Sequence, residues 1–204
     1  YQHLVVKVTP DTVVNSWNDS IYYMEQPMYN QSVAMYYYTN KVLHDNSIVV
    51  TMAGDMGDEI LGGYPKYWKL KQAEYLERMI GKKRIESWDD VLTLWMLRIK
   101  RPLAGFMMGG TLSKKDVFEE LKKCYPDDLW NPKDPVASYM ALDCVTQVPE
   151  EFFMRNDKFG MAFGMEGRFP LATKMFMQYC MSIPSFQKIG IEKFQTKLPT
   201  KTAY

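Results

Sequence analysis

The sequence has few of the residues that bind metals through sulfur or nitrogen. Its three cysteines, Cys124, Cys144 and Cys180, lie far apart, and there are only two histidines. Zinc sites and disulfide frameworks need more cysteine or histidine residues, and closer together in the sequence, than this chain has. The sequence therefore argues against both, and this use of cysteine favours a reduced, cytoplasmic setting.

An excess of charge of one sign is also missing. The chain has 25 basic and 24 acidic residues, so its formal net charge is +1. This balance gives no electrostatic reason to expect binding to nucleic acid or to an anionic membrane. No apolar run reaches the length of a membrane span, and no signal peptide opens the sequence. We therefore expect neither nucleic acid nor membrane as a partner.

What is present is typical of a folded domain. Hydrophobic residues make up 47% and aromatic residues 14% of the 204 residues, enough to bury a sizeable core. The chain opens on the strand-like stretch YQHLVVKV without an initiator Met, and it closes on TKTAY without a polar tail. These two ends predict a segment of a longer protein.

Residues 48–67, IVVTMAGDMGDEILGGYPKY, carry the most informative pattern. The apolar run 48–51 predicts a buried strand that opens into a glycine-containing turn. Three carboxylates lie in that turn: Asp55, Asp58 and Glu59. Ligands bind beyond the carboxyl ends of parallel strands, and such oxygen ligands suit Mg²⁺. An acidic turn that caps the next helix explains the same residues, so the pattern alone leaves both interpretations open.

The first third of the chain predicts α/β structure. Residues 4–8 read as a strand, Thr9 and Pro10 as the start of a helix that ends before Pro27, and residues 32–44 as a second helix. Strand, helix, helix, strand is the order that an open parallel sheet requires. The expected apolar stripes are Val13, Val14, Trp17, Ile21 and Met24 on the first helix, and Ala34, Met35, Tyr38 and Val42 on the second.

After Pro65 the pattern becomes helical. Helices are expected over 66–80, 88–99 and 114–123, the last capped by Ser113. Their Met-rich and aromatic stripes are typical of a core. We predict an α/β nucleotide-binding region at 1–65 and a helical continuation of the same domain at 66–204.

The acidic turn resembles a segment of the asparagine synthetases. That family carries SGEGSDEVFGGY or TGDGGDELFGGY at the end of a central strand, where this chain has MAGDMGDEILGGY. Ala53 replaces the usual Ser, and Met56 replaces a Gly. The resemblance implies part of an open parallel sheet of the adenine-nucleotide alpha-hydrolase, or PP-loop, type, followed by a mostly helical half.

A second block, residues 143–184, resembles the family pattern LPDDLL followed by DRxSMAxxxExRxPFLD. Matching positions are Asp143, Pro149, Glu150, Asp157, Met161, Ala162, Glu166, Arg168 and Pro170. The final acid is replaced by Thr173. For Glu166 and Arg168, a direct role toward substrate and a pair of separate buried ion pairs are both open.

A third, short match lies at 197–203, KLPTKTA, against the family's KxxLRxA. Lys197 stands where the family has a lysine that contacts phosphate, and Lys201 stands where it has an Arg. Pro199 would disturb the interior of a helix. Exposed surface lysines are the alternative at both positions.

The resemblance implies an ATP- and Mg²⁺-dependent ligase. It would adenylate the side chain of aspartate and then displace AMP with ammonia from glutamine. By position, Asp58 is the metal ligand, and Ala53, Gly54 and Glu59 join it in binding the nucleotide. Asp55 and Lys197 are the implied catalytic residues, Asp55 near the incoming ammonia and Lys197 on the phosphates.

Two parts of the family pattern are missing from the sequence: the pyrophosphate loop SGGxDS and the N-terminal glutaminase domain. Two hypotheses follow. The chain is a segment of an amide-forming synthetase, inactive in isolation, or it is a non-catalytic remnant or partner subunit that keeps the fold. The resemblance also allows a homodimer.

Overall fold

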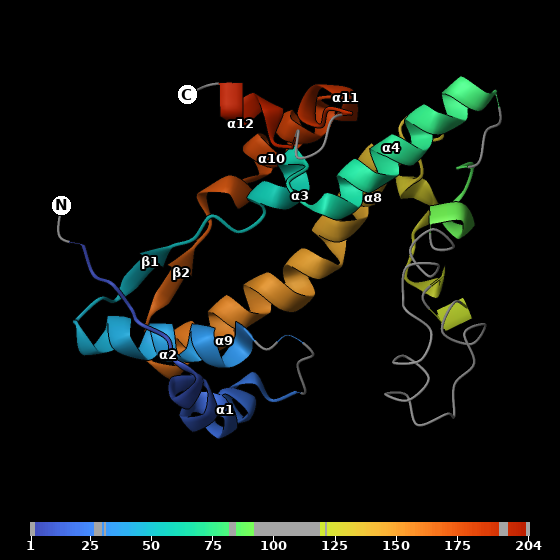
Figure 1. Ribbon diagram of the computed structural model, residues 1–204. Helices are drawn as coiled ribbons and strands as arrows, with labels where there is room; N and C mark the ends of the chain where they lie inside the picture. The colour runs from blue at the N-terminus through green and yellow to red at the C-terminus, as the bar shows by residue number, and fades with distance from the viewer. Residues whose placement is uncertain are drawn as a thin grey trace. The chain divides into compact units, whose positions relative to one another are not determined.

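The computed structural model describes residues 3–26, 30, 32–81, 85–91, 119–120, 122–191 and 196–202. These residues are mostly helical, with one small parallel sheet of two strands (Figure 1). The chain divides into two compact units: unit 1 is 1–56 with 146–174, and unit 2 is 57–145 with 175–204. The division predicted at residue 65 stays a prediction. Within the described residues, no helix is both long and apolar enough to span a membrane.

The sheet of unit 1 pairs β1 (Val50–Met52) with β2 (Glu166–Arg168) in parallel, with Thr51 opposite Gly167. The predicted strand thus forms, but it is not buried, since Val49 is 64% and Met52 77% exposed. The reason is that β2 is its only neighbouring strand among the described residues. The predicted strand at 4–8 is wrong, because those residues pair with no described strand.

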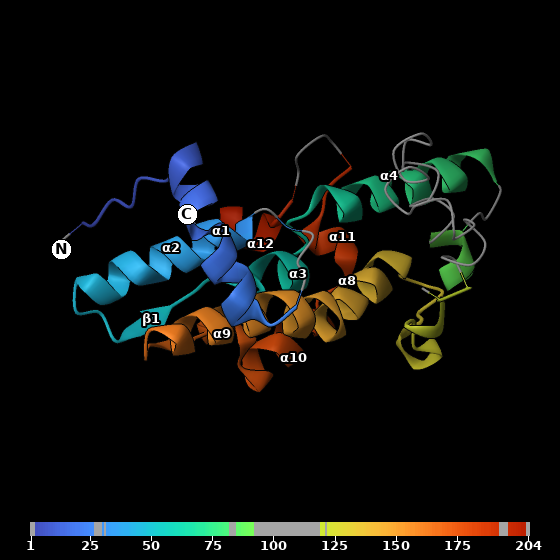
Figure 2. The ribbon, with the colours of Figure 1, turned by 90° about the horizontal axis from the view of Figure 1, so that it is seen from below.

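The first two helices form where the sequence predicts them. Helix α1 (Pro10–Met24) begins with a capping box in which Thr9 and Thr12 bond each other's backbone amides. Helix α2 (Ser32–Asp45) packs against it, and both contact α9 (Met154–Ala162), which follows the π-helical turn η2 (Val148–Phe153) (Figure 2).

The predicted faces of these two helices need correction. Helix α1 buries Ser16, Ser20 and Met24, whereas the expected Val14 and Trp17 are exposed. Small serines allow a neighbouring helix to approach closely, and Ser20 satisfies its hydroxyl by donating to the Trp17 carbonyl at 2.7 Å. Helix α2 buries Val33, Ala34, Tyr37 and Asn40, with Met35 exposed. Met24 and Ala34 are buried as expected. Hydropathy misses the buried Ser20 and Asn40, whose side chains donate to carbonyls of their own helices.

Glu166 and Arg168 do not form separate buried ion pairs. Both lie on strand β2, where residues two apart point to the same face. They are exposed and pair with each other, Arg168 Nε to Glu166 Oε1, at 3.1 Å. This guanidinium lowers the pKa of the Glu166 carboxyl. After β2 comes the turn η3 (Pro170–Ala172), close to the end of unit 1 at residue 174.

Unit 2 is helical. It contains α3 (Gly57–Leu61), α4 (Pro65–Ile80), η1 (Asp127–Leu129), α8 (Pro135–Val145), α10 (Lys174–Ser182), α11 (Ser185–Lys188) and α12 (Leu198–Thr202). Helix α4 confirms the expectation for 66–80, and the capping glycine at its end, Gly81, has φ +69°. The helices predicted at 88–99 and 114–123 lie mostly outside the described residues. Pro199 does not disturb α12, because it stands in the first turn.

The core of unit 2 gathers between α4, α8 and the residues around 85–91. Its buried members are Tyr67, Leu70, Ile85, Trp88, Val91, Val136, Met140, Leu142 and Ile189. The Asp143 carboxylate lies inside this apolar region, bonded to the Tyr67 hydroxyl and to Lys66 Nζ at 2.6 Å. Burial raises the pKa of Asp143, and the Lys66 ammonium acts in the opposite direction. These contacts join α4 to α8.

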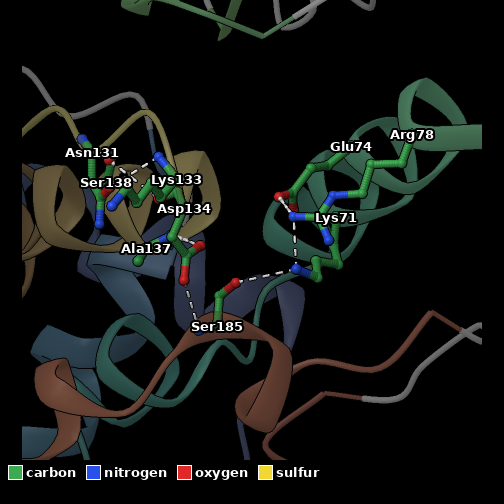
Figure 3. Close-up of polar contacts among 9 residues, drawn as sticks. All are labelled: Lys71, Glu74, Arg78, Asn131, Lys133, Asp134, Ala137, Ser138 and Ser185. Carbon is green, nitrogen blue, oxygen red and sulfur yellow. Dashed lines mark hydrogen bonds and ion pairs between the residues drawn. The ribbon is translucent and has the colours of Figure 1, made fainter. Parts of the chain in front are cut away.

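Polar contacts also hold α11 in place (Figure 3). Lys71 on α4 donates to Glu74 at 3.0 Å and to the Ser185 hydroxyl at 3.4 Å. Asp134 accepts the Ser185 amide at 2.9 Å with one oxygen and the Ala137 amide at 3.0 Å with the other. A single carboxylate therefore caps α8 and fixes the start of α11.

Lys188, at the end of α11, is fully buried. Its Nζ has no hydrogen-bond partner among the residues that the structure describes. Burial lowers the pKa of this amine, and Cys180, Asp134 and Cys144 act weakly in the opposite direction. Folding therefore disfavours the charged amine relative to the unfolded chain, because an ammonium group without partners is costly to bury.

We predict that Lys188→Met stabilises the protein near pH 7, because the parent chain must bury an amine whose charged form has no hydrogen-bond partner among the described residues. A lowered folded pKa makes unfolding take up a proton, so the parent becomes relatively more stable as the pH rises toward the unfolded value of about 10.4. The advantage of the variant should therefore shrink from pH 7 to 10. Urea unfolding at several pH values measures it. Lys133→Met, at an exposed lysine, is the control, and a constant advantage would contradict the assignment.

Candidate functional site

The turn after β1 carries the predicted site residues of unit 1. The Ala53 amide donates to the Arg168 carbonyl at 2.9 Å, so it continues the ladder between β1 and β2. Gly54 is exposed, and a Cβ added there would meet no described atom within 4 Å. The backbone beside Gly54 is therefore open to a ligand.

Asp55 is held by Asn156 of α9. Asn156 Nδ2 donates to Asp55 Oδ2 at 2.6 Å and also to the Phe152 carbonyl at 3.0 Å. Burial raises the pKa of the Asp55 carboxyl, whereas the Arg155 guanidinium and the Asn156 hydrogen bond act in the opposite direction. Asp55 is thus a half-buried carboxylate whose orientation is set by Asn156.

Arg155 is one of the largest buried side chains, at 2% exposure. Its guanidinium lies 3.7 Å from the centre of the Tyr36 ring and pairs with Glu151 at 3.6 Å. Glu151 also accepts from Asn30 at 2.8 Å and from Gln147 at 3.2 Å. These contacts compensate a charge that would otherwise be costly to bury, and they fix the start of α9 beneath Asp55.

In unit 2 the structure brings together two predicted residues from distant parts of the sequence. Lys197 Nζ lies 2.7 Å from Asp58 Oδ1, and both side chains are about one third exposed. The pair connects the residue before α12 to α3, and these two helices lie next to each other. A carboxylate and an ammonium group thus share one accessible point of unit 2.

Gly63 makes room for this pair, and the preceding Gly62 allows the turn that leads to it. A Cβ at Gly63 would overlap both Asp58 Oδ1 and Lys197 Cε. Gly62 ends α3 with φ +73°, and a Cβ there would overlap the Ile189 side chain. The chain therefore turns back on α3 tightly enough for the Gly63 amide to donate to the Asp58 carbonyl at 2.7 Å.

Glu59 differs from Asp58 in being buried, at 1% exposure. Burial raises its pKa, which a hydrogen bond with Tyr64 partly opposes. Its Oε1 has no hydrogen-bond partner within the described part of the chain. Glu59 therefore supports the turn through Tyr64 and does not present its carboxylate at the accessible point where Asp58 lies.

Tyr64 belongs to an aromatic cluster around one lysine. The Lys66 ammonium lies 5.2 Å from the centre of the Tyr64 ring and 5.3 Å from those of Tyr67 and Tyr139. Since Lys66 also pairs with Asp143, the α3–α4 turn is connected to the core of unit 2 by cation–π contacts and an ion pair.

Met56, between Asp55 and Asp58, has a left-handed backbone with φ +77°, and its side chain is 2% exposed. This conformation favours glycine, which is the residue that the family motif has there. The structure thus gives a physical reason for that glycine. The packing of the buried Met56 side chain offsets the strain in its backbone.

The sequence patterns did not single out Asn156, Arg155 or Tyr64. Arg155 and Asn156 stand between the matching positions Glu150 and Asp157, so the second motif was their only sequence signal. Among the described residues, no three His, Cys, Asp or Glu side chains are grouped to hold a metal ion. Mg²⁺ commonly takes one or two protein carboxylates together with phosphate and water. Asp58, a hard oxygen ligand beside a lysine, fits that mode.

A comparison with protein families matches the asparagine synthase model over residues 1–198. Comparisons with curated proteins and with solved structures gave no match. The family is one of ATP-dependent ligases, and its domain has the adenine nucleotide alpha hydrolase fold. The match spans nearly the whole chain and confirms the resemblance of the acidic turn and the second block. The chain belongs to the asparagine synthase family.

Proposed function

We propose that the chain provides part of the active site of an ATP-dependent synthetase that converts aspartate to asparagine. The ion pair between Asp58 and Lys197 carries this proposal. It joins the acidic turn to the lysine of the third motif, and it supplies a carboxylate for Mg²⁺ and an ammonium group for phosphate at one point. Membership of an ATP-dependent ligase family supports the reaction class.

The proposed reaction has two halves. A side-chain carboxylate oxygen of aspartate attacks the α-phosphorus of ATP, and the bond from that phosphorus to the pyrophosphate oxygen breaks. Ammonia released from glutamine then attacks the acyl carbon. The bond to the AMP oxygen breaks and the nitrogen loses one proton. The products are asparagine, AMP and pyrophosphate.

In this proposal the residues of unit 2 bind the phosphates. Asp58 would hold Mg²⁺, which, when bound, neutralises phosphate charge. Lys197 would exchange part of its contact with Asp58 for a phosphate oxygen, and Gly63 keeps the space between these side chains open. The ammonium group would then stabilise the charge that develops as pyrophosphate departs.

Asp55 is proposed to receive the proton that the attacking ammonia loses. Its carboxylate must be ionised for this role, and Asn156 favours the ionised form by donating a hydrogen bond at 2.6 Å. The open backbone of Gly54 would admit the AMP portion of the intermediate. Asn156 and Arg155 act through Asp55 and are positioning residues.

The first test of this proposal is Asp58→Asn in the longest natural form of the protein. We expect loss of Mg²⁺-dependent ATP binding by at least about tenfold, because the amide lacks the charge that holds the cation, with an unchanged circular dichroism spectrum. Isothermal titration with and without Mg²⁺ measures the effect.

The matched control is the same substitution at exposed Asp128, which should bind ATP like the parent. Full synthetase activity in Asp58→Asn would refute the metal assignment. A parent protein that folds but binds no Mg²⁺–ATP would instead support the non-catalytic remnant or partner subunit.

For Asp55, we predict that Asp55→Asn spares adenylation more than amide formation. The amide cannot accept a proton from the attacking nitrogen, but the phosphate contacts of unit 2 are unchanged. Pyrophosphate release and asparagine formation, followed in parallel, separate the two steps. Equal losses in both would rule out the proposed role.

Asn156→Ala tests the positioning of Asp55 through pH. Removing a hydrogen bond to the ionised carboxylate should raise the pKa of Asp55 further, so the acidic limb of amide formation should move to higher pH. The rate of asparagine formation as a function of pH measures this shift. Asn18→Ala, at an exposed asparagine of α1, is the control, and coincident profiles for the two variants would argue against the role.

A further inference from the structure

The ion pair between Lys197 and Asp58 involves an oxygen that a metal ion at Asp58 would need. Lys197 Nζ lies 2.7 Å from Asp58 Oδ1, which is the length of a charge-assisted hydrogen bond. A Mg²⁺ ion on the same carboxylate would lie about 2.1 Å from its oxygen, and so within a few ångströms of the ammonium group. Two positive groups at such a separation repel each other. The lysine and a bare cation therefore compete for this carboxylate.

The surroundings offer a bare cation little compensation for that repulsion. Within the described ranges, no three His, Cys, Asp or Glu side chains are grouped to hold a metal ion. The neighbouring Glu59 is buried and hydrogen-bonded with Tyr64, so it does not reach the accessible point where Asp58 lies. A cation bound at Asp58 without phosphate would therefore have water for most of its other ligands.

The backbone holds the ammonium group close to Asp58. Lys197 has a left-handed backbone with φ +53°, and its carbonyl accepts the Lys201 amide at 3.0 Å as α12 begins. Helix α12 contacts both α3 and α11. Gly63 packs against the pair so closely that a Cβ would overlap both side chains. The lysine thus competes at a high effective concentration, whereas a cation must come from solution.

A bound polyphosphate would remove this competition. Its oxygens accept hydrogen bonds from an ammonium group, so Lys197 can leave Asp58 without losing a charged partner. The same phosphates supply further oxygen ligands to the ion. We propose that Lys197 keeps a divalent cation off Asp58 until a polyphosphate binds, so that the metal enters this point of unit 2 together with the nucleotide. This order of binding rests on the proposed function, which makes Asp58 the metal ligand.

The test is the binding of Mn²⁺ in the absence of nucleotide, measured from the electron paramagnetic resonance signal of the free ion. Mn²⁺ takes the same oxygen ligands as Mg²⁺. In the longest natural form of the protein, Lys197→Met should bind Mn²⁺ at least about fivefold more tightly than the parent, because a cationic competitor is removed. Lys197→Arg keeps the charge and should bind Mn²⁺ like the parent. The double variant Lys197→Met/Asp58→Asn should lose the gain.

The same substitution should act in the opposite direction on an anion. Without metal, Lys197→Met should bind pyrophosphate at least about fivefold more weakly than the parent, because a contact between ammonium and phosphate is lost. Isothermal titration measures this affinity. Lys133→Met, at an exposed lysine of unit 2, removes the same charge and should leave both affinities unchanged. Circular dichroism spectra should match the parent, since the side chains of the ion pair are about one third exposed.

Unchanged Mn²⁺ affinity in Lys197→Met would overturn the proposed order, because it would mean that the ion pair is a loose surface contact. An equal gain in Lys133→Met, or a gain that persists in the double variant, would overturn it as well. The synthetase proposal would survive these results if the parent binds Mg²⁺–ATP. If the parent binds no Mg²⁺–ATP but Lys197→Met gains Mn²⁺ through Asp58, the synthetase proposal fails and the exclusion of the cation by Lys197 holds.

Discussion

The buried carboxylate of Asp143 constrains the rest of unit 2. It lies in an apolar core, so it must keep the Tyr67 hydroxyl and the Lys66 ammonium as partners, and these residues fix α4 against α8. Lys66 is surrounded by three tyrosine rings, one of which belongs to Tyr64. Tyr64 in turn bonds Glu59 on α3, the helix that carries Asp58. Asp58, a candidate site residue, is thus connected to a buried charge several contacts away.

Unit 1 is also organised around a buried charge, but this charge is positive. There the buried charge is the Arg155 guanidinium, compensated by Glu151 and by the face of Tyr36. It lies at the start of α9, next to Asn156, which bonds Asp55. In each unit a buried charge that is fixed by its partners is connected, directly or through further contacts, to a more accessible carboxylate. Such rigid support is what a site needs if its groups must be held before substrate arrives.

Local sequence signals predicted the helices α1, α2 and α4 and the strand β1, but they also predicted a strand at 4–8 that does not form, and they predicted the buried faces only in part. Thr9 and Pro10 mark the start of a helix through backbone geometry alone, so they could be read without knowing the neighbours. Whether Val14 or Ser16 is buried depends on how closely α2 approaches α1. The hydropathy of the residues contains no information about the distance between two helices. Asp58 and Lys197 were found only because two motifs resemble a family. No periodicity or spacing connects residues so far apart. Asn156 was not predicted, because one asparagine side chain by itself forms no sequence pattern.

The departures from the family motif are not equivalent in physical terms. Ala53 keeps its backbone bond to Arg168, so losing the usual serine leaves the ladder intact. Pro199 stands in the first turn of α12, where its missing amide costs little. Met56 is different, because a side chain is held at φ +77° where glycine would be relaxed. Gly63, by contrast, is retained where any Cβ would displace both Asp58 and Lys197. Left-handed backbone thus occurs at Met56 and also at Lys197, with φ +53°, while the space required by the Asp58–Lys197 pair is preserved.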